Sequence, residues 1–258
     1  MIKAGLVSIS FRELKPEEII ELLLKAELNC VEWGGDIHVP HGDLKKAREV
    51  KRICADAGIT VSSYGSYYRA GESEKDGLCF ESVLASAIEL GTSAIRVWAG
   101  KKGSADADPL YRKNVINNLM EISVSASKFR IGISLEFHGG TLTDTNESAI
   151  QLMKEVSHGN LSLYWQPPAG KSFEYRLEGL KSVLPYLGHL HVFHWLTNDG
   201  KHERRPLEEG RTEWMEYLKL AETAKGDRCA LLEFVRDNSK EAFLKDAATL
   251  KKWLLLGK

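Results

Sequence analysis

The sequence predicts a single domain, residues 1–258, folded as a (β/α)8 TIM barrel, and three observations support this fold class. Short apolar runs and amphipathic stretches alternate eight times along the chain. The length suits eight strand–helix units of roughly 30 residues each. No glycine-rich phosphate-binding turn follows the first apolar run, which disfavours an open nucleotide-binding sheet. A closed barrel places its active site at the carboxyl ends of the strands.

The predicted strands are short apolar segments that end at glycines or polar clusters. Segment 131–137, IGISLEF, has the pattern of a parallel strand covered by helices on both faces, because such a strand has little surface in water. The eight predicted strands are 4–10, 29–33, 59–64, 93–99, 131–137, 161–165, 189–194 and 229–235.

Capping residues predict where the helices begin and end. Pro16 suits the first turn of a helix, and the two glutamates after it favour the positive end of the helix dipole. Asp43 is an N-cap, whereas Gly58 and Gly91 are stop signals. The eight predicted helices are 16–26, 44–57, 81–90, 109–129, 146–156, 177–187, 212–224 and a segment from the Ser239 cap to about 255.

Composition and charge exclude several classes of protein. Hydrophobic residues make up 43% of the chain and charged residues 28%, as in an ordinary globular enzyme. The formal net charge of −1 gives no electrostatic footprint for nucleic acid or an anionic membrane. The chain starts without a signal peptide, and its four scattered cysteines form no CxxC pair. We therefore expect a cytoplasmic protein with reduced thiols and no membrane or nucleic-acid partner.

Acidic and imidazole side chains gather at the predicted strand ends. Glu136, His191 and Glu233 lie on the fifth, seventh and eighth strands, whose carboxyl ends a closed barrel brings to one mouth. Two carboxylates and one imidazole form an oxygen-rich set that suits Mn²⁺, Mg²⁺, Co²⁺ or Zn²⁺. Each residue alone has a structural alternative, since Glu233 can pair with a lysine and His191 can be a satisfied interior histidine. Their conjunction on three strands favours a metal site.

Several phrases resemble the xylose-isomerase-like barrels, a group of sugar phosphate isomerases and epimerases. They are LEFHGGTLTDT, HLHVFHW, RRPLEEGRTEW, ALLEFV, GGDIHVPHGD and RVWAG, and the resemblance covers essentially the whole chain. In that family a glutamate, an aspartate, a histidine and a second glutamate bind one divalent metal ion. Glu136, His191 and Glu233 match three of these ligands, and Gln166 stands at the aspartate position. Gln166 offers a carbonyl oxygen but removes a negative charge, so the resemblance implies weaker or altered metal binding.

The resemblance implies an isomerase or epimerase that acts on a sugar, sugar phosphate or cyclitol. The enzyme would abstract a proton next to a carbonyl and form an enediolate. Glu136 and Glu233 would then be the acid/base pair as well as metal ligands. The implied substrate-binding residues are His38, His138, Trp98, His194, Arg204 and Arg205. For at least one of the two arginines a solvated loop charge is an equal alternative, and for a single tryptophan packing between barrel and helices is the commoner role.

Three alternatives share this predicted fold. A keto-sugar or cyclitol dehydratase would use the same metal and the same proton abstraction, followed by loss of hydroxide. A non-catalytic sugar-binding barrel is compatible with Gln166 in place of aspartate. An abasic-site endonuclease is disfavoured, because it needs more histidine and aspartate ligands and a basic groove. The resemblance also implies a homo-oligomer, a dimer or a tetramer.

Overall fold

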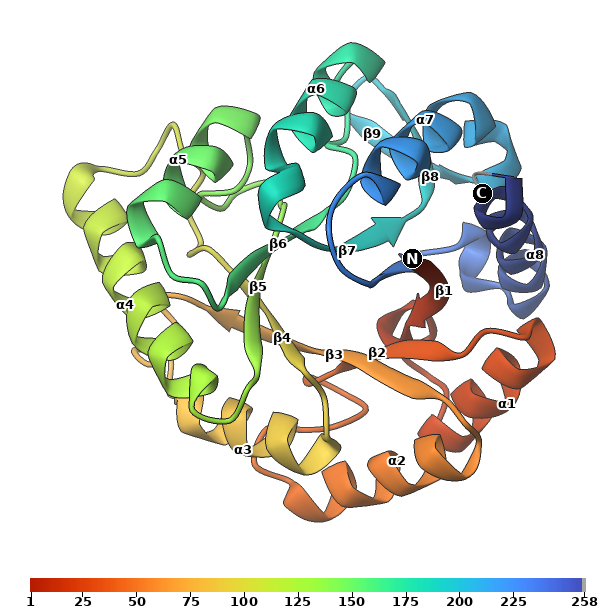
Figure 1. The fold of residues 1–258 in the computed structure, drawn as a ribbon, viewed down its shortest axis with the longest axis horizontal. Helices are drawn as coiled ribbons and strands as arrows, with labels where there is room; N and C mark the ends of the chain where they lie inside the picture. The colour runs from red at the N-terminus through yellow and green to blue at the C-terminus, as the bar shows by residue number, and fades with distance from the viewer. Residues whose placement is uncertain (257–258) are drawn as a thin grey trace.

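Eight parallel strands close into a barrel surrounded by helices in the computed structural model, which describes residues 1–256 (Figure 1). This confirms the predicted TIM-barrel fold class. Around the barrel each strand pairs with its neighbour in chain order, and the last barrel strand closes against the first. The barrel strands are β1 (Ile2–Val7), β2 (Cys30–Gly34), β3 (Thr60–Arg69), β4 (Ala94–Trp98), β5 (Gly132–Glu136), β6 (Leu161–Trp165), β7 (Leu187–Val192) and β10 (Arg228–Leu232).

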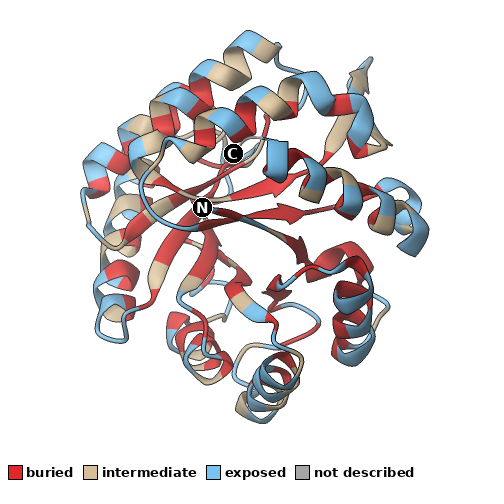
Figure 2. Ribbon diagram, turned by 45° about the vertical axis from the view of Figure 1, so that its right-hand side comes forward, coloured by how far each residue is buried: buried red, intermediate tan, exposed pale blue. Residues whose placement is uncertain are grey.

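The helices bury one face against the barrel and expose the other (Figure 2). The capping residues act as predicted: Asp43 accepts a hydrogen bond from the Lys46 amide, and Gly91 ends its helix at a φ of +76°. The helices are α1 (Pro16–Ala26), α2 (Leu44–Asp56), α3 (Phe80–Leu90), α4 (Pro109–Ser127), α5 (Asn146–Val156), α6 (Phe173–Val183), α7 (Arg211–Glu222) and α8 (Lys240–Leu256).

Several predicted boundaries were wrong, including the end of the eighth strand, which lies at Leu232 instead of residue 235. The first strand ends at Val7, because a 3₁₀ turn, η1 (Ser8–Phe11), follows it. Strand β3 continues past Gly65, where its register with β4 shifts, instead of ending at residue 64. Helix α6 starts earlier and ends earlier than the predicted 177–187. Ser172 caps its start. Pro185 has no backbone N–H with which to continue the helical hydrogen bonds, and the chain passes into a 3₁₀ turn, η2 (Leu184–Tyr186).

The sequence interpretation missed an antiparallel hairpin between β7 and α7. It consists of β8 (His194–Asn198) and β9 (Lys201–Arg205), and its two-residue turn is Asp199–Gly200. Both turn residues have positive φ, +50° and +73°, as a type I′ turn requires. The sequence Asp-Gly between polar and apolar residues is the signal that predicts such a turn. The predicted seventh strand, 189–194, therefore ends early, and His194 belongs to the hairpin.

Within residues 1–256, none of the helices combines the length and the apolar character needed to cross a membrane. All four cysteines are free thiols, three of them buried.

Helix α8 carries a buried carboxylate, Asp246, whose side chain is only 6% exposed. Its Oδ1 accepts a hydrogen bond from the Leu207 amide at 2.9 Å. Burial raises the pKa of Asp246 to about 6, although this hydrogen bond and Arg236 favour the ionised form. Because the pKa in the folded state lies above the ordinary value of 3.8, the folded state binds a proton more tightly than the unfolded state.

We expect Asp246→Asn to stabilise the protein above pH 6.5 by roughly 1–3 kcal/mol. The stabilising contribution of protonated Asp246 is complete below about pH 4 and is lost as the pH rises through about 6. Asparagine keeps an oxygen for the Leu207 amide and never ionises. Chemical denaturation from pH 4 to pH 8 measures the difference, which should vanish near pH 4. If the free energies of unfolding of the two proteins changed with pH in parallel, the raised pKa of Asp246 would be contradicted.

Candidate functional site

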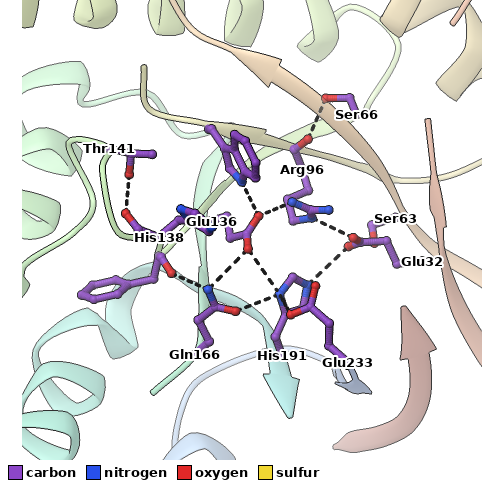
Figure 3. A network of polar contacts seen from close by, with 12 residues as sticks. Glu32, Ser63, Ser66, Arg96, Glu136, His138, Thr141, Gln166, His191 and Glu233 are labelled. Carbon is purple, nitrogen blue, oxygen red and sulfur yellow. Dashed lines mark hydrogen bonds and ion pairs between the residues drawn. The ribbon is translucent and has the colours of Figure 1, made fainter. Parts of the chain in front are cut away.

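The three candidate metal ligands meet at the carboxyl end of the barrel (Figure 3). Glu136 is the last residue of β5, His191 lies in β7, and Glu233 directly follows β10. Their exposed fractions are 3%, 0% and 4%. One ligand atom from each of the three lies within 4.8 Å of the others. The closed barrel thus brings together side chains that are up to about a hundred positions apart in the sequence.

The Nδ1 atom of His191 is the centre of this cluster. It lies 3.2 Å from Oε1 of Gln166, 3.3 Å from Oε2 of Glu233 and 3.7 Å from Oε1 of Glu136. The Gln166 amide nitrogen donates to the Phe137 carbonyl at 2.8 Å. The same nitrogen also donates to Oε1 of Glu136 at 3.4 Å, so these hydrogen bonds orient the amide with its oxygen toward His191.

This arrangement fits a divalent metal ion. Three oxygens and one imidazole nitrogen converge, and hard divalent ions prefer such a mixed donor set. The buried charges also fit. Arg96 pairs with Glu32 and Glu136, and Glu233 pairs with His191. With His191 neutral, as a metal ligand must be, the three carboxylates and Arg96 would leave two negative charges. A divalent cation would balance them. Burying such charges without a counter-ion is costly.

Arg96 and Glu32 are buried charged residues that the sequence interpretation did not assign to the site. Arg96 is 1% exposed on β4 and donates to Glu32 on β2 and to Glu136 on β5. Glu32 is fully buried and also accepts from Ser63 at 2.7 Å. A sequence signal exists for both, since each is a charge inside an otherwise apolar strand, in SAIRVWA and NCVEW.

These contacts determine the protonation of the cluster. Burial alone would raise the pKa of Glu136, but Arg96, His191, His138 and the Trp98 N–H outweigh it and lower that pKa. Burial likewise opposes ionisation of Glu32, yet Arg96, His191 and Ser63 hold its pKa well below the usual range. Burial lowers the pKa of His191, but Glu233 and Glu32 raise it to about 10. Without a metal the imidazole thus carries a proton among the carboxylates.

A cavity of about 470 Å³ opens above the cluster, a volume typical of small-molecule sites. It is lined by Glu136, Phe137, His138, Gly139, Asp144, Gln166, Pro167, Pro168, Ala169, Lys171, Phe193, Trp195, His202, Glu233 and Phe234.

Aromatic rings stand on two sides of the acidic cluster. On one side Trp98 donates to Glu136 and lies 4.7 Å from the His138 ring, centroid to centroid. On the other side Trp195 packs against His202 and Phe234 at 5.8 and 5.9 Å. Phe234 has a φ of +49°, which is rare for a bulky residue, and such backbone strain concentrates at functional sites.

His138 is a predicted substrate-binding residue that lines the cavity. Its Nδ1 lies 2.7 Å from the Gly139 carbonyl, an acceptor, so Nδ1 carries the proton. Nε2 is the ring atom left to form a hydrogen bond with a substrate hydroxyl.

The hairpin separates the two predicted arginines, because neighbouring residues of a strand point to opposite faces. Arg204 pairs with Trp195 across the hairpin, and its guanidinium lies 4.9 Å from the centre of the Phe234 ring, at the edge of the cavity. Arg205 is on the other face and bonds Glu203 and Glu209, each at 2.8 Å. These two carboxylates pair with Arg205, in line with the alternative that one of the two arginines is a solvated loop charge.

Three further predicted substrate residues are not among those that line this cavity. The Trp98 ring packs against the Arg69 guanidinium at 4.2 Å and against His138. His194 lines a small separate pocket with Arg176, Glu213 and Trp214 between the hairpin and the outer helices. His38 is 3% exposed and its Nδ1 lies 2.9 Å from Ser8 Oγ, behind the end of β1. Burial lowers the pKa of His38, although hydrogen bonds to nearby backbone carbonyls oppose this shift. The lowered pKa keeps the ring neutral.

We expect Gln166→Asp to bind divalent metal about tenfold more tightly than the native protein, because it adds a negative charge to the ligand set. The metal-free variant should be less stable, since the new carboxylate loses the amide bond to the Phe137 carbonyl. Isothermal titration with Mn²⁺ and thermal unfolding measure the two effects. Gln166→Ala is the control and should bind more weakly than the native protein. Equal affinities in all three proteins would remove residue 166 from the ligand set.

A family model described as xylose isomerase-like TIM barrel matches residues 20–253. A curated 3-dehydroshikimate dehydratase from Bacillus anthracis is 28% identical over 171 residues, which cover 58% of this chain and 59% of that protein. The match thus spans about three fifths of the relative's length.

Two solved structures share the fold over nearly the whole chain. A probable dehydratase of 3-DHS involved in petrobactin synthesis in Bacillus anthracis superposes with a TM-score of 0.80 at 21% identity, covering 97% of this chain and 99% of that one. A xylose isomerase-like barrel protein from Mycobacterium smegmatis in complex with magnesium gives 0.78 at 17% identity, covering 100% and 98%. The resemblance seen in the sequence is confirmed: the protein belongs to the xylose isomerase-like TIM barrel family.

Proposed function

We propose that this protein is a metal-dependent enzyme that abstracts a proton next to the carbonyl of a small sugar or cyclitol and returns it as an isomerase. The observation that carries the proposal is the convergence of Glu136, Gln166 and Glu233 on Nδ1 of His191, at the floor of a substrate-sized cavity. Two carboxylates buried this close together are costly unless cations balance them, and a bound divalent ion would do so.

Four side chains would hold the ion: Glu136, Gln166, His191 and Glu233. A divalent ion bound there supplies Lewis-acid polarisation of a carbonyl and makes the adjacent C–H more acidic. His138 would bind a substrate hydroxyl at Nε2 and so orient the ring or chain. The aromatic ring of Trp195 lines the cavity with Phe193 and Phe234 and would offer an apolar surface to the C–H groups of a sugar.

The two carboxylates have unequal surroundings, which favours unequal roles. Arg96 and Trp98 both donate to Oε2 of Glu136 and stabilise its ionised form. A carboxylate stabilised in this way is a poor proton donor. Among the described residues Glu233 makes an ion-pair contact only with His191, at 3.3 Å. We therefore assign the proton transfer to Glu233 and a fixed negative charge to Glu136, rather than an equal acid/base pair.

Dehydration is the second candidate, and two observations favour it. The curated relative from Bacillus anthracis is named as a 3-dehydroshikimate dehydratase. A single carboxylate also suffices for elimination: Glu233 would take the proton next to the carbonyl and return it to the hydroxyl that leaves the next carbon, so that a C–O bond breaks and water is released. Epimerisation by two carboxylates on opposite faces would need Glu136 to donate a proton, which its contacts with Arg96 and Trp98 disfavour.

Proton exchange in D₂O tests the proposal. The metal-loaded protein is incubated with a panel of ketoses, aldoses, cyclitols and 3-dehydroshikimate, and NMR follows exchange at the carbon next to the carbonyl. We expect exchange with isomerised product for a sugar; loss of water, detected by mass spectrometry, would select the dehydratase. We expect Glu233→Gln to slow exchange by about 10²–10⁴-fold, because the proton acceptor is gone.

Metal content is measured for each variant, so that loss of the ion is not mistaken for loss of the base. Glu136→Gln, compared at equal metal occupancy, should slow exchange less than Glu233→Gln does. Equal losses would instead support the acid/base pair expected from the sequence. Sugar binding by a metal-loaded protein without any exchange would contradict the enzyme and favour a binding protein.

A further inference from the structure

We propose that Glu32 is a positioning residue for the metal site: it orients His191 directly and Glu136 through Arg96. The inference rests on the metal site proposed above. It assigns a role to a buried carboxylate that is outside the ligand set and does not face the cavity. Figure 3 shows the chain of contacts from Glu32 to both ligands.

Glu32 is itself held firmly. Its Oε1 accepts from Nε of Arg96 at 2.7 Å, and its Oε2 accepts from Oγ of Ser63 at 2.7 Å. The neighbouring strand leaves room for this pair at Gly65. A Cβ at that position would lie 2.6 Å from Oε1 of Glu32 and 2.8 Å from Nη2 of Arg96. A carboxylate fixed at both oxygens in a closely packed interior is suited to orienting other groups.

The direct contact runs from Glu32 to His191. The imidazole presents Nδ1 to the oxygens of the ligand set, and its Nε2 lies 3.8 Å from Oε2 of Glu32. Nε2 is buried and has no hydrogen-bond partner within residues 1–256. An imidazole that gives its Nδ1 lone pair to a metal keeps its remaining proton on Nε2. Glu32 is the carboxylate that faces this proton, and such a partner sets the tautomer and raises ligand basicity.

The indirect contact runs through Arg96. Its planar guanidinium donates Nε to Glu32 and Nη1 to Glu136, so one rigid group joins the two carboxylates. Arg96 occupies Oε2 of Glu136, and Oε1 is the oxygen that faces His191. Without the Glu32 anchor the guanidinium would be free to shift toward the ligand set. Glu32 thus acts on ligands from two different strands, β5 and β7.

A purely structural role for Glu32, as one half of a buried ion pair, predicts a different result. Loss of the pair would lower stability but leave the metal affinity and ligand geometry of the folded protein unchanged. Metal affinity and the protonation of His191 therefore distinguish the two roles, and neither requires knowledge of the substrate.

The test compares full-length Glu32→Gln with the native protein and with Glu155→Gln, which removes a carboxylate from the Arg112 ion pair on the outer helices. Metal-free proteins are titrated with Co²⁺ by calorimetry and by visible absorption, which reports ligand geometry. We expect Glu32→Gln to bind Co²⁺ about 10–100-fold more weakly, with a changed spectrum, and Glu155→Gln to match the native protein.

In the Zn²⁺-loaded proteins, two-bond ¹H–¹⁵N correlations report which ring nitrogen of His191 carries the proton. The native protein should show one tautomer with the proton on Nε2, and Glu32→Gln should lose this single state. Ser63→Ala, which removes one donor to Glu32, should weaken Co²⁺ binding by a smaller factor and provides the comparison if Glu32→Gln does not fold.

Two outcomes would overturn the proposal in distinguishable ways. Native-like Co²⁺ affinity, spectrum and tautomer in folded Glu32→Gln, or in Ser63→Ala if that is the variant measured, would overturn the positioning role alone. Failure of the native protein to take up Co²⁺ would overturn the proposed metal site and the positioning role together.

Discussion

The bond of Arg96 to two carboxylates is the interaction on which the rest of the site depends. Three buried carboxylates surround the barrel mouth, and carboxylates in a low-dielectric interior repel one another and favour protonation. Arg96 is the buried guanidinium that keeps Glu32 and Glu136 ionised. Because it contacts both, it also fixes the distance between β2 and the end of β5 at the mouth. Its own burial is tolerable only because both partners are charged and hydrogen-bonded.

The closed barrel makes this network possible. Glu32, Ser63, Arg96 and Glu136 come from four consecutive barrel strands, so each is a neighbour of the next. His191 and Glu233 approach from β7 and β10 on the far side of the ring. Inward-pointing side chains of a small barrel fill its interior in layers. Here the layer at the carboxyl end consists of charged side chains instead of aliphatic ones. In an open sheet, the side chains from β2 to β5 would lie apart from those of β7 and β10.

Much of the fold and the centre of the site could be predicted from the sequence, because both depend on local patterns. Apolar runs and caps predict the eight strands, and carboxyl ends of strands in a barrel must meet. The pairing of charges across strands carries no such local pattern. The sequence therefore does not predict that Arg96 bonds both Glu32 and Glu136, although Arg96 and Glu32 each stand out as a charge in an apolar strand. The faces of the hairpin were also unpredictable without its register: Arg204 reaches the cavity edge, whereas its neighbour Arg205 turns to Glu209. His194 was misplaced for the same reason, since β7 ends two residues before it.

The same charge balance gives a physical interpretation of Gln166. With glutamine at this position and a neutral His191, the three carboxylates and Arg96 leave two negative charges, which a divalent ion would neutralise. With the family aspartate they would leave three, and the loaded site would remain anionic. A neutral loaded site is easier to bury and does not repel an electron-rich substrate oxygen. Glutamine therefore lowers the attraction for the ion without removing a donor atom, and its amide hydrogen bond to Phe137 keeps that donor oriented. In the proposed metal site, glutamine would thus weaken binding of the ion and stabilise the metal-free protein.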